Sequence, residues 1–180
     1  MLAPVVFKPT PLVGAFVVEP EPRRDVRGLF ARTWCREEFA AQGLNPALVQ
    51  CNVSFTERRG TVRGMHYQDT PHEEAKLVRC VRGAIHDVII DLRPRSPTFR
   101  QHFAVELREG SYRMLYVPEG VAHGFQTLLD DTEVTYQMSE FHRPDAERGV
   151  RWDDPAFAIP WPEPVRLISD RDRAFPDFRG

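Results

Sequence analysis

The chain has 180 residues, of which 42% are hydrophobic, and it carries 24 basic against 26 acidic residues. This apolar content excludes a disordered protein, and the near balance of charge gives no reason to expect nucleic acid or an anionic membrane as a partner. The uncharged run at residues 9–18 is too short and too interrupted by proline to cross a bilayer. No basic segment precedes this run, so we expect no secretory signal. The three widely spaced cysteines suit neither a disulfide framework nor a zinc site. We therefore expect a cytoplasmic protein.

One helix and a series of short strands are predicted along the chain. Residues 35–42 carry good helix formers and stop before Gly43, a residue type that commonly ends helices. The other segments are short, rich in Val, Ile, Phe and Tyr, and bounded by Gly or Pro, which is typical of strands. The predicted strands are residues 12–18, 49–56, 76–81, 84–92, 103–107, 113–117, 123–129 and 133–138.

The connections between these segments favour an all-β fold. Arg82 and Gly83 separate two predicted strands and indicate a tight hairpin. Sixteen prolines suit a loop-rich β protein and disfavour a helical bundle. Many short strands with Gly and Pro turns predict a sandwich or barrel, with the jelly roll among the options. From about residue 145 the Pro and Trp content rises, which predicts an irregular tail wrapped on one domain that spans residues 1–180.

The most informative segment runs from Arg63 to Gln68, with Lys76 shortly after it. It places His66 and Lys76 on what we predict to be neighbouring strands, with Arg63 beside the histidine. A base, a cation and an anchor for phosphate in one place suit proton abstraction next to a carbonyl of a phosphorylated substrate. Metal-binding cupins need His-x-His at such a place, whereas Gln68 stands two residues after His66. We therefore expect an acid/base enzyme with no metal and no cofactor.

A set of short motifs extends this pattern over nearly the whole chain. The motifs in chain order are Asp25-Val26-Arg27-Gly28, Arg63-Gly64-Met65-His66-Tyr67-Gln68, Lys76-Leu77-Val78, Gly83, Asp87-Val88, Asp91-Leu92-Arg93, Ser96-Pro97-Thr98-Phe99, Pro118-Glu119-Gly120-Val121-Ala122-His123-Gly124-Phe125, Trp152-Asp153-Asp154-Pro155, Trp161-Pro162 and Ser169-Asp170-Arg171-Asp172. Each is weak alone, but together and in this order they resemble the dTDP-4-dehydrorhamnose 3,5-epimerase family. The resemblance implies a metal-free cupin-type jelly roll with short flanking helices, and a homodimer that exchanges an N-terminal strand.

The resemblance also implies roles for individual residues. His66 matches the family's base, Asp172 the carboxylate that orients it, Lys76 the cation facing the enolate, and Tyr136 the acid on the opposite face. The implied substrate-binding residues are Arg27, Phe30, Gln50, Asn52, Arg63, His123, Glu147 and Arg171. From the residues alone, Gln50 and Asn52 are two apart on one strand, so both side chains face the same side.

Taken singly, these residues also have ordinary structural explanations. Lys76 follows a polar loop and suits a solvated lysine, Asp172 lies in a charged run, and Tyr136 fits a core aromatic. The turn before His123 is also explained by a purely structural role in closing a barrel. The histidines that lack a motif are expected to be structural, namely His72, His86, His102 and His142.

Two positions depart from the family pattern. Arg32 stands where the family often has an acidic residue, and His142 stands where a second tyrosine is usual. The nucleotide is therefore less firmly indicated than the chemistry.

The predicted function is epimerisation at carbons 3 and 5 of a dTDP-linked 4-keto-6-deoxyhexose, through an enolate. The alternatives are a mono-epimerase at carbon 3 or 5, an enzyme for CDP- or GDP-linked sugars, and a non-catalytic nucleotide-sugar-binding module. The module would not need the proton of Tyr136, and a metal cupin dioxygenase or isomerase conflicts with Gln68. The expected partners are the nucleotide sugar and a second copy of the chain, with neither nucleic acid nor membrane.

Overall fold

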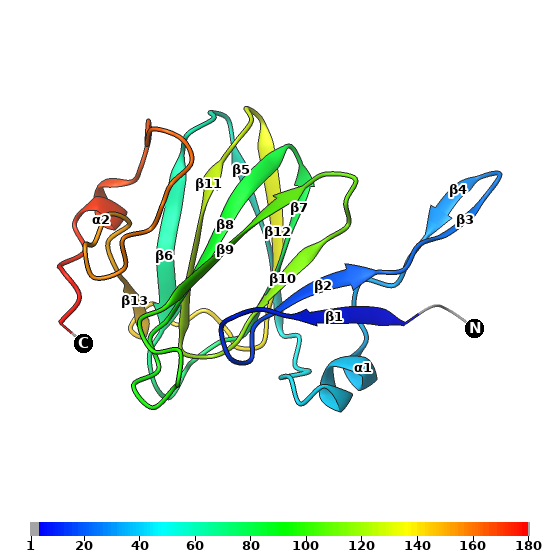
Figure 1. Cartoon of the computed structure of the whole chain (residues 1–180), viewed down its shortest axis with the longest axis horizontal. Helices are drawn as coiled ribbons and strands as arrows, with labels where there is room; N and C mark the ends of the chain where they lie inside the picture. The colour runs from blue at the N-terminus through cyan, green and yellow to red at the C-terminus, as the bar shows by residue number, and fades with distance from the viewer. Residues whose placement is uncertain (1–3, 180) are drawn as a thin grey trace.

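The structure is a computed structural model that describes residues 4–179 (Figure 1). Its strands are β1 (Val5–Pro9), β2 (Phe16–Pro20), β3 (Arg23–Asp25), β4 (Gly28–Phe30), β5 (Gln50–Thr56), β6 (Val62–Gln68), β7 (Lys76–Arg82), β8 (Ala84–Asp91), β9 (His102–Arg108), β10 (Met114–Val117), β11 (Val121–Thr127), β12 (Thr132–Met138) and β13 (Glu147–Gly149). The helices are α1 (Arg36–Ala41) and α2 (Asp170–Arg173). In the described part of the chain, neither helix is long and apolar enough to cross a membrane.

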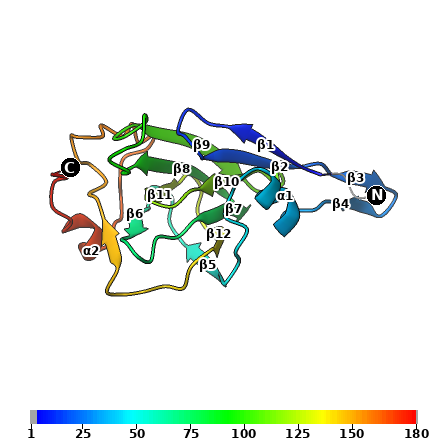
Figure 2. The ribbon, with the colours of Figure 1, turned by 90° about the horizontal axis from the view of Figure 1, so that it is seen from below.

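Two antiparallel sheets face each other and form a sandwich (Figure 2). One has six strands in the order β1-β2-β10-β7-β12-β5, and the other has five in the order β13-β6-β11-β8-β9. Most neighbours in each sheet are far apart in sequence, as in a jelly roll, where the chain repeatedly crosses between sheets. The predicted all-β fold class is confirmed.

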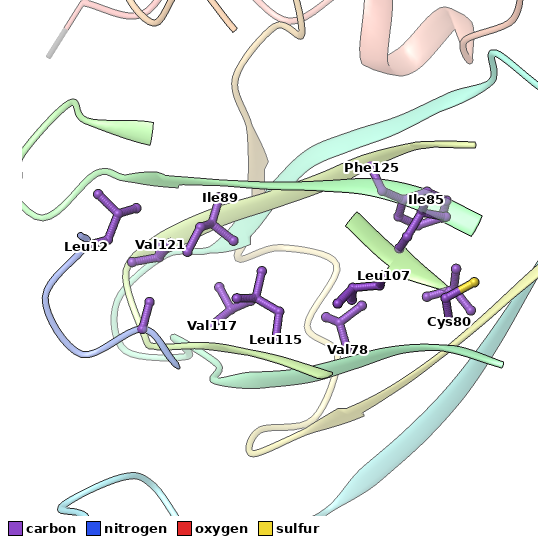
Figure 3. Packing of buried hydrophobic residues seen from close by; sticks show 12 residues of the cluster. Leu12, Val78, Cys80, Ile85, Ile89, Leu107, Leu115, Val117, Val121 and Phe125 are labelled. Carbon is purple, nitrogen blue, oxygen red and sulfur yellow. The ribbon is translucent and has the colours of Figure 1, made fainter. Parts of the chain in front are cut away.

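The main hydrophobic core fills the space between the two sheets (Figure 3). Both sheets contribute inward-facing side chains from alternate strand positions, which is the pattern expected of a sandwich. The cluster consists of Leu12, Ala15, Val78, Cys80, Ile85, Ile89, Leu107, Leu115, Val117, Val121, Phe125 and Val134. Each fully buried Leu or Ile contributes about 1.5–3 kcal/mol relative to an exposed one.

Strand β8 is buried on both faces, which explains its nearly continuous apolar sequence. Ile85 and Ile89 pack into the core between the sheets. Val88 and Ile90 belong to a second cluster with Phe157. The irregular C-terminal segment therefore covers the outer face of the five-stranded sheet.

The predicted helix at residues 35–42 is confirmed, because α1 has Cys35 and Gln42 as its caps. Phe39 anchors α1 on the outer face of the six-stranded sheet. Its ring lies 5.0 Å from that of Phe7 and 5.9 Å from that of Tyr116, between centroids.

The predicted hairpin at Arg82 and Gly83 is wrong. β7 lies in the six-stranded sheet and β8 in the five-stranded sheet, so this turn carries the chain from one sheet to the other. Gly83 has a φ of +79°, and a Cβ there would lie 2.4 Å from the Thr132 hydroxyl, so the turn requires glycine. A tight turn between two apolar strands has the same sequence pattern whether or not the strands pair.

The predicted strand at 12–18 is shifted, because β2 starts at Phe16. Leu12 and Ala15 lie in the preceding turn but are buried in the core. Their apolar character therefore reflects packing and not an extended backbone.

Strands β3 and β4 form a two-stranded arm that projects from the sandwich (Figures 1 and 2). Its side chains are largely exposed, including the apolar Val26 and Phe30. No strand was predicted here.

Asp91, at the end of β8, is a fully buried carboxylate that organises the following loop. It accepts hydrogen bonds from Arg93 Nε and Nη2, both at 2.8 Å, and from the hydroxyls of Ser96 and Thr98. Burial alone would raise the pKa of Asp91, but these hydrogen bonds outweigh it and lower the pKa to about 2. Arg93 also donates to the carbonyl of Val13, which ties this loop to the turn before β2.

We predict that Asp91→Asn lowers the free energy of unfolding at pH 7 by about 1–3 kcal/mol, because it leaves buried donors poorly paired. The pKa is about 2 in the folded chain against 3.8 without these contacts, so the contribution is complete above pH 3.8 and is lost as pH falls towards 2. Urea unfolding of wild type and variant should show a smaller difference at pH 3 than at pH 7. The exposed Asp145→Asn is the control, and an equal difference at both pH values would contradict this account.

Candidate active site

A pocket of about 410 Å³ opens between the two sheets at the end where β5, β6 and β13 lie. It is lined by polar side chains that take the inward positions occupied by core residues elsewhere in the sandwich. Eight of the residues predicted for the site line it, namely Gln50, Asn52, Arg63, His66, Lys76, His123, Tyr136 and Glu147.

His66 and Asp172 form a dyad at the wall of this pocket. His66 Nε2 lies 2.6 Å from Asp172 Oδ1, although the two residues are 106 positions apart. Asp172 is 5% exposed, and its Oδ2 also accepts a hydrogen bond from the Gly64 N–H at 3.2 Å. Burial would raise the pKa of Asp172, but the bonds from His66 and Gly64 lower it below its usual value. The carboxylate is therefore ionised at neutral pH.

This geometry fixes the tautomer of the neutral His66 ring. An ionised carboxylate only accepts hydrogen bonds, so Nε2 carries the proton and Nδ1 keeps a free lone pair. Nδ1 has no hydrogen-bond partner among residues 4–179. His66 therefore presents a base to the pocket.

A bulge in β6 brings Arg63 and His66 to the same side of the strand although they are three residues apart. His66 pairs with His123 and Arg63 with Phe125, so β6 has one more residue than β11 between these pairs. The extra length falls at Gly64, which has a φ of +120°. A Cβ on Gly64 would lie 2.5 Å from the Gly124 Cα, so only glycine fits.

The C-terminal segment also packs on the His66 ring. Phe175 lies edge-on to it, with 6.0 Å between ring centroids. Gly149 pairs with His66 across β13 and β6, and a Cβ there would lie 2.2 Å from the Phe175 ring. The absence of a side chain at Gly149 therefore makes room for Phe175.

A second His–Asp pair stands directly beside the first. His123 is the register partner of His66, and its Nε2 lies 2.6 Å from Oδ1 of the fully buried Asp87. The sequence places Asp87 in one of the short motifs but does not indicate its role. A carboxylate inside the apolar run of β8 was the available signal, because charged residues are almost never fully buried without a partner.

Lys76 reaches the pocket from the opposite sheet. The predicted placement of His66 and Lys76 on neighbouring strands is wrong, because β6 and β7 belong to different sheets and do not pair. The two residues nevertheless meet across the interior, where Lys76 Nζ donates to the His66 carbonyl at 3.0 Å. Nζ also lies 2.8 Å from Oε1 of Glu74, a residue that the sequence analysis missed.

Tyr136 lies on β12, in the sheet opposite His66, and lines the pocket. Burial raises the pKa of its phenol, while Arg63 opposes and Glu147 adds to this rise. The phenol therefore holds its proton at neutral pH.

Charged side chains gather at the rim of the pocket. Arg171 Nη2 lies 2.8 Å from Glu147 Oε1, and His142 Nε2 lies 3.7 Å from Glu147 Oε2. Arg171 itself is outside the pocket lining, whereas His142 is part of it. His142 was expected to be structural, and the structure instead places it in the wall of the site.

The side-chain amide of Gln68 is hydrogen-bonded to the surrounding backbone. Its amide nitrogen donates to the carbonyls of His72 and Phe141, and its oxygen accepts from the Arg143 N–H. The residue that replaces the second histidine of the metal motif therefore clamps two loops beside the pocket.

Two predicted residues lie away from the pocket of their own chain. Arg27 and Phe30 are on the projecting arm, where Arg27 pairs with Asp25 at 2.5 Å. Arg32, the departure from the family pattern, forms an ion pair with Glu38 of α1 and does not line the pocket.

Comparisons with known proteins agree with this arrangement. A sequence profile of dTDP-4-dehydrorhamnose 3,5-epimerase matches residues 9–180. A protein of that name from Methanothermobacter thermautotrophicus is 39% identical over 96% of this chain and 94% of its own length. The crystal structure of the Bacillus anthracis enzyme with TDP and PPi bound has a TM-score of 0.93 at 39% identity, covering 97% of this chain and 100% of that one. A dTDP-4-dehydrorhamnose 3-epimerase from Streptomyces niveus is 40% identical over 93% of this chain and 81% of its own.

The fold is that of a cupin-type jelly-roll isomerase, and its pocket brings an imidazole, a lysine amino group and a phenol together in one cavity. The matches cover nearly all of the chain at identities well above those that show only a fold. The chain belongs to the dTDP-4-dehydrorhamnose 3,5-epimerase family.

Proposed function

We propose that this protein epimerises carbons 3 and 5 of dTDP-4-dehydro-6-deoxyglucose to give dTDP-4-dehydrorhamnose, using its own side chains as acid and base. The observation that carries this proposal is the His66–Asp172 dyad, with Tyr136 on the opposite sheet of the same pocket. The names of the relatives and the TDP bound to the Bacillus anthracis enzyme support the substrate class.

Proton removal falls to His66. The hydrogens on carbons 3 and 5 flank the ketone at carbon 4, so loss of either one gives an enolate. Nδ1 of His66 takes the proton, and the ionised Asp172 stabilises the imidazolium that results.

The enolate oxygen needs a positive or donating group nearby. Lys76 supplies an ammonium and His123 an imidazole, both in the pocket wall. Donors fixed in place before reaction stabilise developing charge more effectively than water, because they need not reorganise.

Proton return from the opposite face inverts the carbon. Tyr136 suits this step at carbon 5, because its phenol stays protonated at neutral pH and reaches the pocket from the sheet opposite His66. A binding module would need no such acid, so the combination favours catalysis.

The nucleotide side of the substrate is assigned to the polar and charged residues near the rim. Arg63 donates to the Thr56 hydroxyl at 2.9 Å and to the Phe55 carbonyl at 3.1 Å, which holds a guanidinium fork at the pocket wall for phosphate oxygens. Gln50 and Asn52 also line the pocket, where the Gln50 amide nitrogen donates to the Asn52 oxygen at 3.2 Å, and we assign them to the sugar or base. Glu147 and Arg171 complete the proposed set.

We further propose a homodimer in which the arm of one chain reaches the pocket of the other. β5 is an edge strand, and its outer face exposes Val53 (63%) and Phe55 (45%), while the arm exposes Phe30 (59%). An open, apolar strand edge favours association with another chain. In this assembly Arg27 and Phe30 contact the substrate bound by the partner.

A cytoplasmic location completes the proposal. Cys35, Cys51 and Cys80 are free thiols, which suits a reducing compartment.

The first test is solvent exchange. Incubation of the wild type with dTDP-4-dehydro-6-deoxyglucose in deuterated water should place deuterium at carbons 3 and 5, as read by mass spectrometry and NMR. His66→Ala should slow both exchanges about 10²–10⁴-fold, because it removes the general base. His102→Ala, on the distant strand β9, is the matched control. Unchanged exchange in His66→Ala would remove that residue from the mechanism, and exchange at carbon 3 alone in the wild type would indicate a mono-epimerase.

The second test separates the two inversions. Tyr136→Phe keeps the packing of the ring but removes the acidic proton, so we expect loss of inversion at carbon 5 with measurable exchange at carbon 3. The 3-epimerised ketosugar should then accumulate, as followed by NMR. Tyr112→Phe removes a phenol outside the pocket as a control. Doubly inverted product formed by Tyr136→Phe at the wild-type rate would reduce Tyr136 to a packing role.

The third test concerns the arm. Arg27→Ala and His66→Ala proteins should each be inactive, but their heterodimer should regain activity, because one of its two pockets has both residues intact. Differently tagged subunits purified in tandem establish that exchange has occurred. Inactive heterodimers would mean that each pocket is built from one chain.

A further inference from the structure

The side chain of Lys76 is buried, and the buried side chain of Glu74 lies beside it. The side chains of Lys76 and Glu74 are 8% and 3% exposed, and Nζ lies 2.8 Å from Glu74 Oε1. The only other lysine of the sequence, Lys8, has a side chain that is 57% exposed.

The direction in which Lys76 points follows from its hydrogen bonds. An ammonium has three N–H donors, and here one is directed to Glu74 and one to the His66 carbonyl at 3.0 Å. Because Lys76 also lines the pocket, the third donor is left for a ligand there.

Glu74 is itself held from two sides. Its Oε2 accepts the Gln68 N–H at 3.0 Å, and the Gln68 amide in turn donates to the His72 carbonyl at 2.8 Å. The loop between β6 and β7 is therefore fastened to β6 in a way that fixes the carboxylate against Lys76.

Burial by itself favours the neutral amine, because an ammonium loses its hydration. A carboxylate in contact reverses that preference. Glu147 is the other carboxylate in the lining formed by residues 4–179, and it is engaged by Arg171. The other charged or titratable groups around the pocket are Arg63, His66 and Tyr67 from β6, His123 from β11, Tyr136 from β12 and His142 after β12. Where these side chains are cationic, they disfavour a charge on Lys76.

We propose that Glu74 is a positioning residue: its carboxylate keeps Lys76 protonated and directs one of its N–H groups into the pocket. The catalytic consequence rests on the proposed function, in which Lys76 faces the enolate. The electrostatic part does not, and can be measured without substrate.

The first experiment titrates the two lysines by NMR in protein labelled with ¹³C-lysine, with Lys8→Arg used to assign the signals. In the wild type, the midpoint for Lys76 should be equal to or above that of Lys8 despite its burial. Glu74→Gln should lower the Lys76 midpoint by about 1–3 pH units, because the opposite charge is lost. Glu73→Gln, which makes the same charge change one residue away and outside the pocket lining, should leave it unchanged. Glu74→Asp, which retains the charge, should keep the Lys76 midpoint close to that of the wild type.

A Lys76 midpoint that is the same in wild type and Glu74→Gln would overturn the proposal. If Glu74→Gln does not fold, as judged by circular dichroism, the proposal is tested by comparing the Lys76 and Lys8 midpoints in the wild type. A Lys76 midpoint more than about one pH unit below that of Lys8 would show that burial prevails and that Glu74 does not hold the charge.

The second experiment measures kcat and KM against pH for the same variants with the dTDP-sugar. We expect the alkaline decline of kcat to begin at lower pH in Glu74→Gln, with KM within about twofold of wild type, because only charge stabilisation in the transition state is lost. A uniform loss of kcat at all pH values would indicate a merely structural role. If the wild type does not turn over this substrate, the proposed function fails, while the NMR titration still decides the role of Glu74.

Discussion

The hydrogen bond between Asp172 and His66 makes the pocket depend on the C-terminal part of the chain. α2, which carries Asp172, is only four residues long and has no independent stability. Its position comes from the preceding C-terminal segment, whose Phe157 packs with Val88 and Ile90 on the outer face of the five-stranded sheet. Apolar packing on one face of this sheet thus orients the base on its other face.

The interior of the sandwich changes from apolar to polar along its length, and each buried carboxylate at the polar end has a cationic or donating partner. Asp87 is paired with His123 and Glu74 with Lys76, at 2.6 Å and 2.8 Å. Ionised groups buried without partners would cost several kcal/mol each, so such pairs are a condition for hollowing a core into a site.

Sequence alone predicted the fold class, the single longer helix and most core strands, because alternation and Gly or Pro boundaries are local signals. The resemblance to the family also predicted eight residues that line the pocket. The sequence did not reveal which strands pair, and the turn at Gly83 shows why: pairing depends on packing of the whole sandwich. Glu74 was missed because one carboxylate in a polar loop resembles its neighbour Glu73, and only the folded position of Lys76 distinguishes them.

The pocket is divided between central and edge elements of the two sheets. Four residues lie on strands with a paired neighbour on each side, so hydrogen bonds to two strands hold their backbone in place. They are His66, Lys76, His123 and Tyr136. The groups assigned to the nucleotide lie on edge strands β5 and β13, on the bulged β6, on the arm and in α2. The two departures from the family pattern, Arg32 and His142, both lie outside strands. A change at His142 can therefore alter the pocket wall without moving the strands that carry His66, Lys76, His123 and Tyr136.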